Sequence, residues 1–403
     1  MNLDLIRELR RPADTTIVLL VLDGLGGMPD SEHGGLTELE AARTPNLDRL
    51  AAEGICGLHE PVAAGITPGS GPSHLAVFGY DPFRFDVGRG VLSALGIDFD
   101  LRSGDVAARG NFATVDGSGN VTDRRAGRIP TDTARRLCEK LRTIDIPGVE
   151  LFVQAEKEHR FVLVLRGEDL DDDVEDTDPQ RTGVPPVEPR AGSETARRTA
   201  EAVATFVDGA RRLLSGEDRA NMVLLRGFAS LPDWPSLGDV AGMRTAAVAG
   251  YPMYRGVARL LGMDIVEAGA KPEESFPVVR QQWDGYDFFY VHVKKTDSAG
   301  EDGDFERKLQ VIEDADRHLP TLLGARPDVL VVTGDHSTPS QMRSHSWHPV
   351  PVLLWAPDTC RPDRVERFGE RECLAGALGP RIPAPDLMSL ALAYAGRPNK
   401  FGS

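Results

Sequence analysis

Short apolar runs recur along the chain, separated by longer segments in which apolar residues repeat with helical spacing. The runs at 16–22, 288–293 and 329–332 contain no Asp, Glu, Lys or Arg. Continuous runs of this kind predict strands that are buried on both faces. The stretch at 305–323 has apolar residues along one side and predicts an amphipathic helix. Strands that alternate with helices predict an α/β fold built on a doubly wound, mostly parallel sheet.

The pattern changes from about residue 104, where strand-like runs lie closer together. The expected elements are strands at 106–115, 121–129, 149–154 and 160–165 and helices at 133–143 and 193–214. The first two strands are joined by a short Gly-Ser-Gly-Asn turn, which is typical of a hairpin. We therefore expect a smaller α+β domain at 102–218, inserted between residues 1–101 and 219–403 of the main domain. The acidic run at 168–178 is expected to be a solvated loop.

The 403 residues carry a net charge of −16, with 27% charged and 41% hydrophobic residues. This composition is typical of a globular protein long enough for two domains. The negative charge argues against nucleic acid or an anionic membrane as a partner. An anionic small molecule stays compatible with it, because metal ions and arginines can reverse the local potential. The apolar runs are too short to span a bilayer.

The cysteine positions and the first residues bear on the compartment. Cys56, Cys138, Cys360 and Cys373 are scattered, with no close pair. This spacing matches neither a disulfide framework nor a zinc cluster and is typical of reduced thiols. The first residues alternate charged and apolar side chains and lack the apolar core of a signal peptide. We therefore expect a cytoplasmic protein.

Potential metal ligands follow three of the predicted strands. Asp23 follows the first apolar run, Asp297 the second, and Asp335 with His336 the third. Ligands bind at the carboxyl ends of strands in open α/β sheets, and carboxylates with imidazole suit a divalent metal. A strand that ends in a polar loop would explain any one of these positions. Three such positions at the same predicted edge favour a site.

A serine between two glycines is the second candidate feature. Gly69 and Gly71 allow the backbone around Ser70 to bend and to approach a ligand. A helix that begins near Pro72 would direct free N–H groups at an anion held by Ser70. The alternative is a polar turn that caps this helix, since Gly-Ser-Gly is common in loops.

The predicted insert also contains basic residues that could bind a carboxylate or phosphate bidentately. These residues are Arg124, Arg125, Arg128, His159 and Arg160. For each of them, a salt bridge to the neighbouring acidic run is a nearly equal alternative.

Several longer motifs are distributed over nearly the whole chain. They are Leu22-Asp23-Gly24, Thr44-Pro45-Asn46-Leu47-Asp48-Arg49-Leu50, Gly69-Ser70-Gly71-Pro72-Ser73-His74, Phe78-Gly79-Tyr80-Asp81-Pro82, Gly88-Arg89-Gly90, Asp176-Thr177-Asp178-Pro179, Tyr254-Arg255-Gly256-Val257-Ala258, Thr333-Gly334-Asp335-His336, and His345 with Pro349-Val350-Pro351. With these motifs the chain resembles the archaeal-type, 2,3-bisphosphoglycerate-independent phosphoglycerate mutases of the alkaline phosphatase superfamily. The segment around Ser70 joined to the Phe-Gly-Tyr-Asp-Pro motif is the most specific part of the resemblance.

By position, the resemblance implies that Ser70 is a nucleophile that becomes a phosphoserine. It also implies two divalent metal ions, one held by Asp23, Ser70, Asp335 and His336, and the other by Asp297 and His345. The family has a histidine four residues after the Asp297 position, where this chain has Glu301. Glu301 is expected to take its place as a ligand, which would shift the metal preference from Zn²⁺ toward Mn²⁺ or Mg²⁺.

The activity implied is the reversible interconversion of 3-phosphoglycerate and 2-phosphoglycerate, in glycolysis and gluconeogenesis, without 2,3-bisphosphoglycerate as a cofactor. Coordination to a metal activates a serine hydroxyl, and two ions can stabilise an in-line phosphoryl transfer. The insert would act as a substrate-binding lid that excludes water. The expected substrate-binding residues are His74, Arg125, Arg128, Arg160, Arg226 and Arg255. His74 could instead brace the Ser70 loop. An oligomer is compatible with the sequence.

Two other functions fit the same residues. A metal-dependent phosphatase or phosphodiesterase would use the same serine and metals but would admit water. A non-catalytic phosphoglycerate-binding protein would result if Glu301 had impaired one metal site. A sulfatase fits less well, because the sulfatase nucleophile motif carries an arginine at the position of His74.

Overall fold

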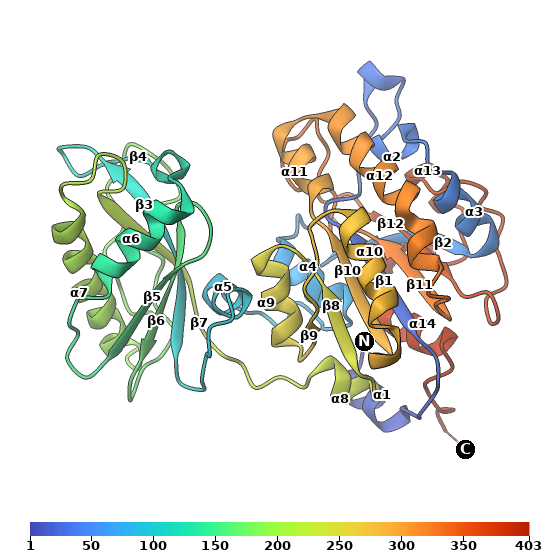
Figure 1. Cartoon of the computed structure of the whole chain (residues 1–403), viewed down its shortest axis with the longest axis horizontal. Helices are drawn as coiled ribbons and strands as arrows, with labels where there is room; N and C mark the ends of the chain where they lie inside the picture. Colours follow the sequence, from blue (N-terminus) through green and yellow to red (C-terminus); the bar gives the residue numbers. More distant parts are fainter. Residues whose placement is uncertain (403) are drawn as a thin grey trace. The chain divides into compact units, whose positions relative to one another are not determined.

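The computed structural model describes residues 1–402, which form two compact units. The core unit consists of Met1–Asp86 and of the chain from Pro235 onward, and the insert unit consists of Val87–Trp234. Figure 1 shows a large sheet with helices on both sides in the core unit and a smaller sheet with its own helices in the insert unit. The mixed α/β fold and the mostly parallel main sheet predicted from the sequence are confirmed.

The core sheet has eight strands in the order β13-β2-β12-β11-β1-β10-β8-β9. Their bounds are β1 (Ile17–Leu22), β2 (Ile55–Glu60), β8 (Thr245–Val248), β9 (Asp264–Ile265), β10 (Phe288–Val293), β11 (Val329–Thr333), β12 (Val350–Trp355) and β13 (Gly379–Pro383). The central strand β1 pairs in parallel with both β10 and β11. Strand β12 runs antiparallel to both of its neighbours, β11 and β2.

The register of the three central strands brings their carboxyl ends to one edge of the sheet. Leu22 of β1 pairs with Val293 of β10, and Val21 of β1 pairs with Thr333 of β11. The residues that follow these strands therefore emerge side by side. The predicted ligand-bearing loops come directly after these three strand ends.

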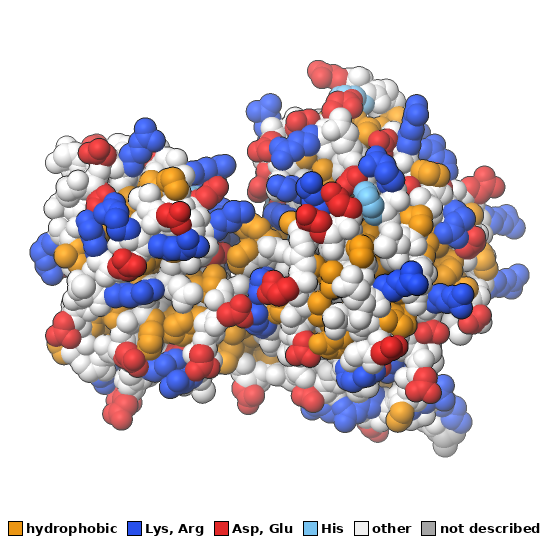
Figure 2. All heavy atoms as spheres, in the orientation of Figure 1, with side chains coloured by type: hydrophobic (Ala, Val, Ile, Leu, Met, Phe, Trp, Pro, Cys, Tyr) orange, Lys and Arg blue, Asp and Glu red, His pale blue; other side chains and the backbone are white. Residues whose placement is uncertain are grey.

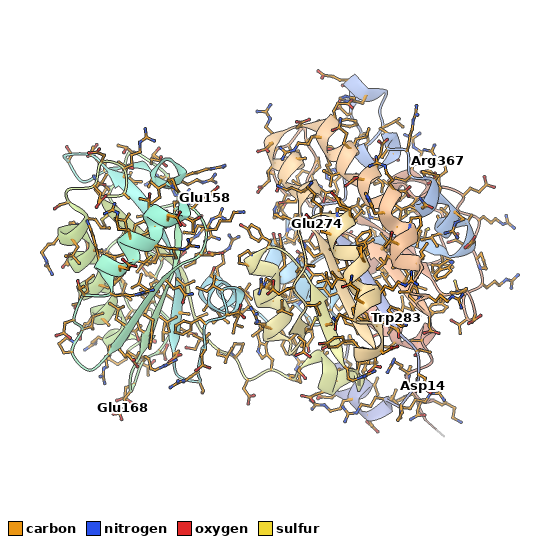
Figure 3. All side chains as sticks on the ribbon, viewed as in Figure 1. Asp14, Glu158, Glu168, Glu274, Trp283 and Arg367 are labelled. Carbon is orange, nitrogen blue, oxygen red and sulfur yellow. The ribbon has the colours of Figure 1, made fainter. Side chains whose placement is uncertain are left out.

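Helices cover both faces of the core sheet. The core helices are α1 (Leu3–Leu9), α2 (Glu38–Ala41), α3 (Pro45–Glu53), α4 (Ser70–Val77), α8 (Leu237–Ala241), α9 (Pro252–Leu260), α10 (Pro272–Gln281), α11 (Lys295–Asp302), α12 (Phe305–Leu323), α13 (Glu370–Cys373) and α14 (Asp386–Tyr394). Leu20 and Leu22 pack in one apolar cluster with residues of α3, α10 and α12. Trp283, labelled in Figure 3, stacks on Phe289 at 5.5 Å between ring centroids and extends this cluster. On the other face, Tyr290 meets Phe78 of the α4 terminus edge-on.

The insert unit has a five-stranded sheet in the order β4-β3-β6-β5, with β7 paired to β3. Its strands are β3 (Val106–Val115), β4 (Val121–Asp123), β5 (Glu150–Ala155), β6 (Arg160–Arg166) and β7 (Met222–Ser230), and its helices are α5 (Arg89–Gly96), α6 (Thr131–Leu141) and α7 (Arg197–Leu214). An apolar cluster of its own includes residues of α6, α7 and the sheet.

The insert begins and ends at positions that differ from the predicted boundaries at 102 and 218. Residues 219–403 were assigned to the main domain, but strand β7 lies in this range and pairs antiparallel with β3 of the insert. Helix α5, which precedes the predicted boundary, packs against β3 and β7. The strand predicted over 121–129 ends at Asp123, since Gly127 has φ +64° inside a short 3-10 turn.

Two further observations concern the surface. On the face drawn in Figure 2, basic and acidic side chains are interspersed, so the excess acidic charge is not gathered in one patch among the described side chains there. Of the helices in the described part of the chain, none combines the length and the apolar character required to cross a bilayer.

Helix α5 lies directly on the insert sheet at Gly90, where a Cβ atom would overlap the backbone of Ala107. We expect Gly90→Ala to destabilise the insert by roughly 1–3 kcal/mol, because overpacking exceeds the gain in helix propensity. Gly216→Ala is the matched control, since a Cβ there meets open space. Urea unfolding measures the stability of both variants. Hydrogen exchange of the β3 amides then shows whether the insert is the part that is destabilised. Equal protection in the two variants would contradict the packing argument.

Candidate active site

Three buried carboxylates meet at the carboxyl ends of β1, β10 and β11. Asp23 follows β1, Asp297 lies in the first turn of α11 after β10, and Asp335 follows β11. All three are at most 1% exposed. The structure therefore brings together the acidic residues that the strand pattern had placed at this edge.

His336 joins these carboxylates into two overlapping groups. Its Nε2 lies 3.4 Å from Asp23 Oδ1, 3.2 Å from Asp335 Oδ2 and 4.0 Å from Asp297 Oδ1. One group is Asp23, Asp335 and His336, and the other is Asp297, His336 and His345. The potential ligand atoms within each group lie within 4.8 Å of one another. His345 reaches Asp297 Oδ1 with its Nε2 at 3.6 Å.

The donor set fits a divalent cation. Both carboxylate oxygens of Asp23 are buried and lack a hydrogen bond of regular geometry within the described chain, and the cation nearest to them is Lys294, whose Nζ lies 3.0 Å from Oδ2. Buried carboxylate oxygens without partners are costly unless a cation neutralises them. Carboxylates combined with imidazole suit Mn²⁺, Mg²⁺ and Zn²⁺, so this set alone does not choose among them.

Hydrogen bonds fix the orientation of the two imidazoles. The Thr338 hydroxyl donates to Asp297 Oδ1 at 2.8 Å, so it can only accept from His336 Nδ1 at 3.0 Å. His345 Nδ1 donates to the Pro68 carbonyl at 2.8 Å. Burial lowers the pKa of His336, although the neighbouring carboxylates of Asp335, Asp23 and Asp297 oppose this shift. In both rings Nδ1 carries the proton, and Nε2 faces the carboxylates as the potential metal ligand.

The carboxylate of Asp335 is held by its neighbours. Gly24 N donates to Oδ1 at 3.1 Å, and the Ser73 hydroxyl donates to Oδ2 at 3.1 Å. Burial opposes ionisation of Asp335, and so does the Asp23 charge, yet the His336 and His74 rings outweigh both and keep its pKa below the usual value. Asp335 is therefore an oriented anion.

Lys294 is a cation of the site that sequence reasoning did not identify. Its Nζ lies 3.0 Å from Asp23 Oδ2 and forms an ion pair with Asp297 Oδ2. Burial by itself would lower the pKa of Lys294, but Asp23 and Asp297 raise this pKa above the usual value. Burial by itself would raise the pKa of Asp23. Lys294, together with His292 and His336, outweighs burial and holds the pKa of Asp23 well below its usual value. Lys294 thus links the carboxylates of the two groups.

Ser70 is the first residue of α4, and its hydroxyl faces the site. Its Oγ lies 3.4 Å from His336 Nε2. His74, one turn later in α4, contacts the Ser70 carbonyl at 2.8 Å and Asp335 Oδ2 at 3.0 Å through Nδ1. His74 is fully buried, and Tyr254 packs on its ring at 4.7 Å. These contacts brace the Ser70 helix, which is the alternative role expected for His74.

Glu301 lies outside both groups. It is an exposed residue of α11, one turn after Asp297. None of the three groups of potential ligand atoms found among the described residues includes it. Its expected role as a metal ligand stays a prediction.

The predicted arginines are divided between the two units. In the insert, Arg109 of β3 pairs in register with Arg226 of β7. Burial lowers the pKa of Arg109 to about 9, and the charges of Arg226, Arg160 and Arg89 contribute to this shift. Burial also lowers the pKa of His159 to about 3, and the charges that reinforce this shift are those of Arg160, Arg125, Arg109 and Arg128. The insert therefore has a basic cluster that contains four of the predicted residues. Arg109 was missed, although a lone arginine within an apolar strand was a usable signal.

Two other arginines have acidic partners. Arg124 binds Asp178 through Nε at 2.8 Å and Nη2 at 2.7 Å, as the salt-bridge alternative expected. Arg255 pairs with Glu267 Oε1 at 2.6 Å. Arg255 lies in the core unit, whereas the basic cluster lies in the insert.

Comparison with known sequences gives a consistent result. The profile of a family described as 2,3-bisphosphoglycerate-independent phosphoglycerate mutase matches residues 51–219. A Thermus thermophilus protein named probable 2,3-bisphosphoglycerate-independent phosphoglycerate mutase is 50% identical, over 99% of this chain and 98% of its own. A protein with the same name from Aquifex aeolicus is 47% identical over the whole of both chains.

Solved structures agree with the sequence comparison. A cofactor-independent phosphoglycerate mutase from Thermoplasma acidophilum is 34% identical with a TM-score of 0.71, over 95% of this chain and all of its own. A protein from Pyrococcus horikoshii is 30% identical with a TM-score of 0.85, over 97% of this chain and all of its own. The motif resemblance found in the sequence is therefore confirmed over nearly the full length.

The ion pairs of Lys294 predict a measurable effect in metal-free protein. We expect Lys294→Met to lower the free energy of unfolding by about 3 kcal/mol in chelator, because it leaves buried carboxylates without a cation. Lys295→Met is the matched control, since Lys295 is the exposed neighbour in sequence. Urea unfolding at neutral pH measures both variants. Equal losses would show that Lys294 does not compensate the carboxylates.

Proposed function

We propose a catalytic mechanism on the premise that this chain belongs to the 2,3-bisphosphoglycerate-independent phosphoglycerate mutase family. The chain is accordingly an isomerase that acts on phosphoglycerate. In our proposal, Ser70 accepts the phosphoryl group from 3-phosphoglycerate and returns it to the 2-hydroxyl group of the same glycerate. The family name states that 2,3-bisphosphoglycerate is not required.

The observation that supports this proposal is the position of the Ser70 hydroxyl. Its Oγ lies 3.4 Å from His336 Nε2, and His336 belongs to both ligand groups. A serine hydroxyl is a weak nucleophile near neutral pH unless a base or a cation activates it. Divalent cations bound by the two groups would lower the pKa of this hydroxyl and neutralise charge on the phosphoryl group.

The reaction then proceeds in two balanced steps. The Ser70 hydroxyl loses its proton as Oγ attacks phosphorus, the bond from phosphorus to the 3-oxygen of glycerate breaks, and that oxygen takes up a proton, so the number of protons is unchanged. The 2-hydroxyl group of the retained glycerate next loses its proton and attacks the phosphoserine, which restores the Ser70 hydroxyl. Asp23, Asp335 and His336 would hold a cation beside Oγ, and His74 keeps the start of α4 in place. No phosphate is released overall.

We propose two divalent ions, Mn²⁺ or Mg²⁺ with Zn²⁺ as the alternative. Asp23, Ser70, Asp335 and His336 would bind one, and Asp297 with His345 would bind the other. Glu301 is proposed as a further ligand of the second ion. Carboxylate-rich sets favour the harder ions of this series.

We propose that the basic residues Arg125, Arg128, Arg160 and Arg226 of the insert, with Arg255 of the core, bind the anionic groups of phosphoglycerate. The partly buried guanidinium groups of Arg109 and Arg226 repel one another, and although Glu156, Asp176 and Asp178 offset part of this repulsion, a bound anion would relieve it further. The proposed setting is glycolysis or gluconeogenesis in the cytoplasm. The four cysteines are free, as a reducing compartment favours.

Removal of the Ser70 hydroxyl tests the covalent mechanism. We expect Ser70→Ala to lower kcat by at least ~10⁴-fold in an assay coupled to enolase, because the acceptor atom is lost. Ser298→Ala on α11 is a control that retains activity. Wild-type protein quenched in acid with ³²P-labelled substrate should carry one labelled serine, which Ser70→Ala lacks. Normal turnover in Ser70→Ala would end the covalent mechanism, and release of free phosphate by the wild type would favour the phosphatase.

The two overlapping groups predict different metal losses in different variants. Wild-type protein should bind two Mn²⁺ ions, and His345→Ala should retain one, because Asp23, Asp335 and His336 stay intact. His336→Ala should weaken the first ion, because His336 Nε2 is one of its proposed ligands, whereas the second ion keeps Asp297 and His345. Glu301→Ala should weaken the second ion only if Glu301 ligates it. Equilibrium dialysis followed by metal analysis measures the stoichiometry. A single ion in the wild type would contradict the two-metal proposal.

A further inference from the structure

A fully buried lysine lies behind the site on α12. The side chain of Lys308 is 0% exposed, although an amphipathic helix normally keeps lysine at its surface. Its Nζ donates to the Gly26 carbonyl at 3.0 Å and to the Thr338 carbonyl at 2.9 Å. The third neighbour is Glu38 of α2, whose Oε2 lies 3.6 Å away.

The two carbonyls belong to the loops that carry the ligands. Gly26 lies three residues after Asp23, and Thr338 lies two residues after His336. The Gly26 carbonyl also accepts from Thr338 N at 3.0 Å, so it is shared by the second loop and by Lys308. The Thr338 side chain contacts Asp297 and His336. One ammonium group therefore joins the loop after β1 to the loop after β11.

Glu38 adds helix α2 to this connection between the two loops. Its Oε1 accepts from Ser340 N at 2.8 Å, and its Oε2 is buried with the Lys308 ammonium as its facing charge. Burial lowers the pKa of Lys308, and the Glu38 carboxylate opposes that shift. Both side chains are at most 2% exposed. The charge pair is thus enclosed by the protein.

Stability alone accounts poorly for such a pair. Replacement of a buried ion pair by apolar residues of similar size is often neutral or stabilising, because desolvation of two charges is expensive. What an apolar pair cannot do is donate to two carbonyls at once. The specific contribution of Lys308 is the connection between the loops.

We propose that Lys308, paired with Glu38, is a positioning residue that sets the separation between the loop of Asp23 and the loop of Asp335 and His336. It thereby fixes the ligand groups around the Ser70 hydroxyl without touching the substrate. The inference rests on the proposed reaction at Ser70 and adds a requirement to it. A displacement of either loop by about 1 Å is enough to cost a large factor in a phosphoryl transfer.

The test compares Lys308→Met with the double variant Lys308→Met/Glu38→Leu. The single variant leaves a buried carboxylate unpaired and is expected to be unstable. The double variant removes both charges and is expected to recover the unfolding free energy. If positioning is the role, kcat stays at least ~10-fold below wild type in the double variant, with KM little changed. Recovery of kcat together with stability would show a purely structural pair and overturn the proposal.

A second measurement needs neither metal nor substrate. Hydrogen exchange at the Thr338 amide reports the bond to the Gly26 carbonyl directly. In chelator, the double variant should exchange this amide at least ~10-fold faster, while amides within β11 stay protected. Ile312→Ala is the matched control, because it weakens the same helix inside the apolar cluster and removes no hydrogen bond to either loop. It should destabilise the protein but leave the Thr338 amide and kcat unchanged. Unchanged exchange in the double variant would overturn the proposal.

The outcomes separate this inference from the mechanism on which it rests. If Ser70→Ala keeps its activity, the covalent mechanism fails. Faster exchange at Thr338 in the double variant would still support the connection of the two loops through Lys308. If Ser70→Ala is inactive and the double variant matches wild type in both exchange and kcat, the mechanism stands and the positioning role of Lys308 is wrong.

Discussion

The site depends on the repulsion among carboxylates that the fold forces into one buried place. Asp23, Asp297 and Asp335 are each nearly inaccessible to water and surround a single imidazole. Like charges at such separations cannot all stay ionised in a medium of low polarity without cations. Lys294 supplies one positive charge beside Asp23 and Asp297, which leaves the three carboxylates in excess of the cations that the described chain provides.

The sheet supplies the constraint that keeps the carboxylates together. Three adjacent parallel strands end at one level, and each is buried in apolar packing on both faces. Their loops leave the sheet within a few residues of one another, so the ligand positions have little freedom. The hydrogen bonds of Thr338, Gly24 and Ser73 then orient the individual oxygens. Strand register thus sets the position of each ligand, and the loops set its direction.

Sequence reasoning recovered the parts of this arrangement that follow from local patterns. The apolar runs before Asp23, Asp297 and Asp335 indicated both the strands and the edge at which these side chains meet. Ser70 and His345 required the family motifs, because nothing in their own segments indicates which distant loop they approach. The structure places both beside His336. Their chemical roles stay a proposal.

Other parts could not be predicted because they depend on pairing or burial. The apolar run that became β7 carries no sign of which sheet it joins, and its partner is β3 of the insert. Lys294 and Lys295 are identical neighbours, and only the geometry after β10 decides which one turns inward. Lys308 has the sequence context of a surface lysine on an amphipathic helix. Its burial depends on two loops that lie far from it in the chain.

The proton positions on His336 and His345 have a consequence for how a cation enters. Each ring gives its Nδ1 proton to an acceptor inside the protein, Thr338 in one case and the Pro68 carbonyl in the other. An ion bound as we propose would therefore meet lone pairs that already point at it, and neither imidazole would have to exchange tautomers or rotate. The entropy of arranging these donors is lost when the chain folds, so affinity is gained through preorganisation rather than through extra contacts.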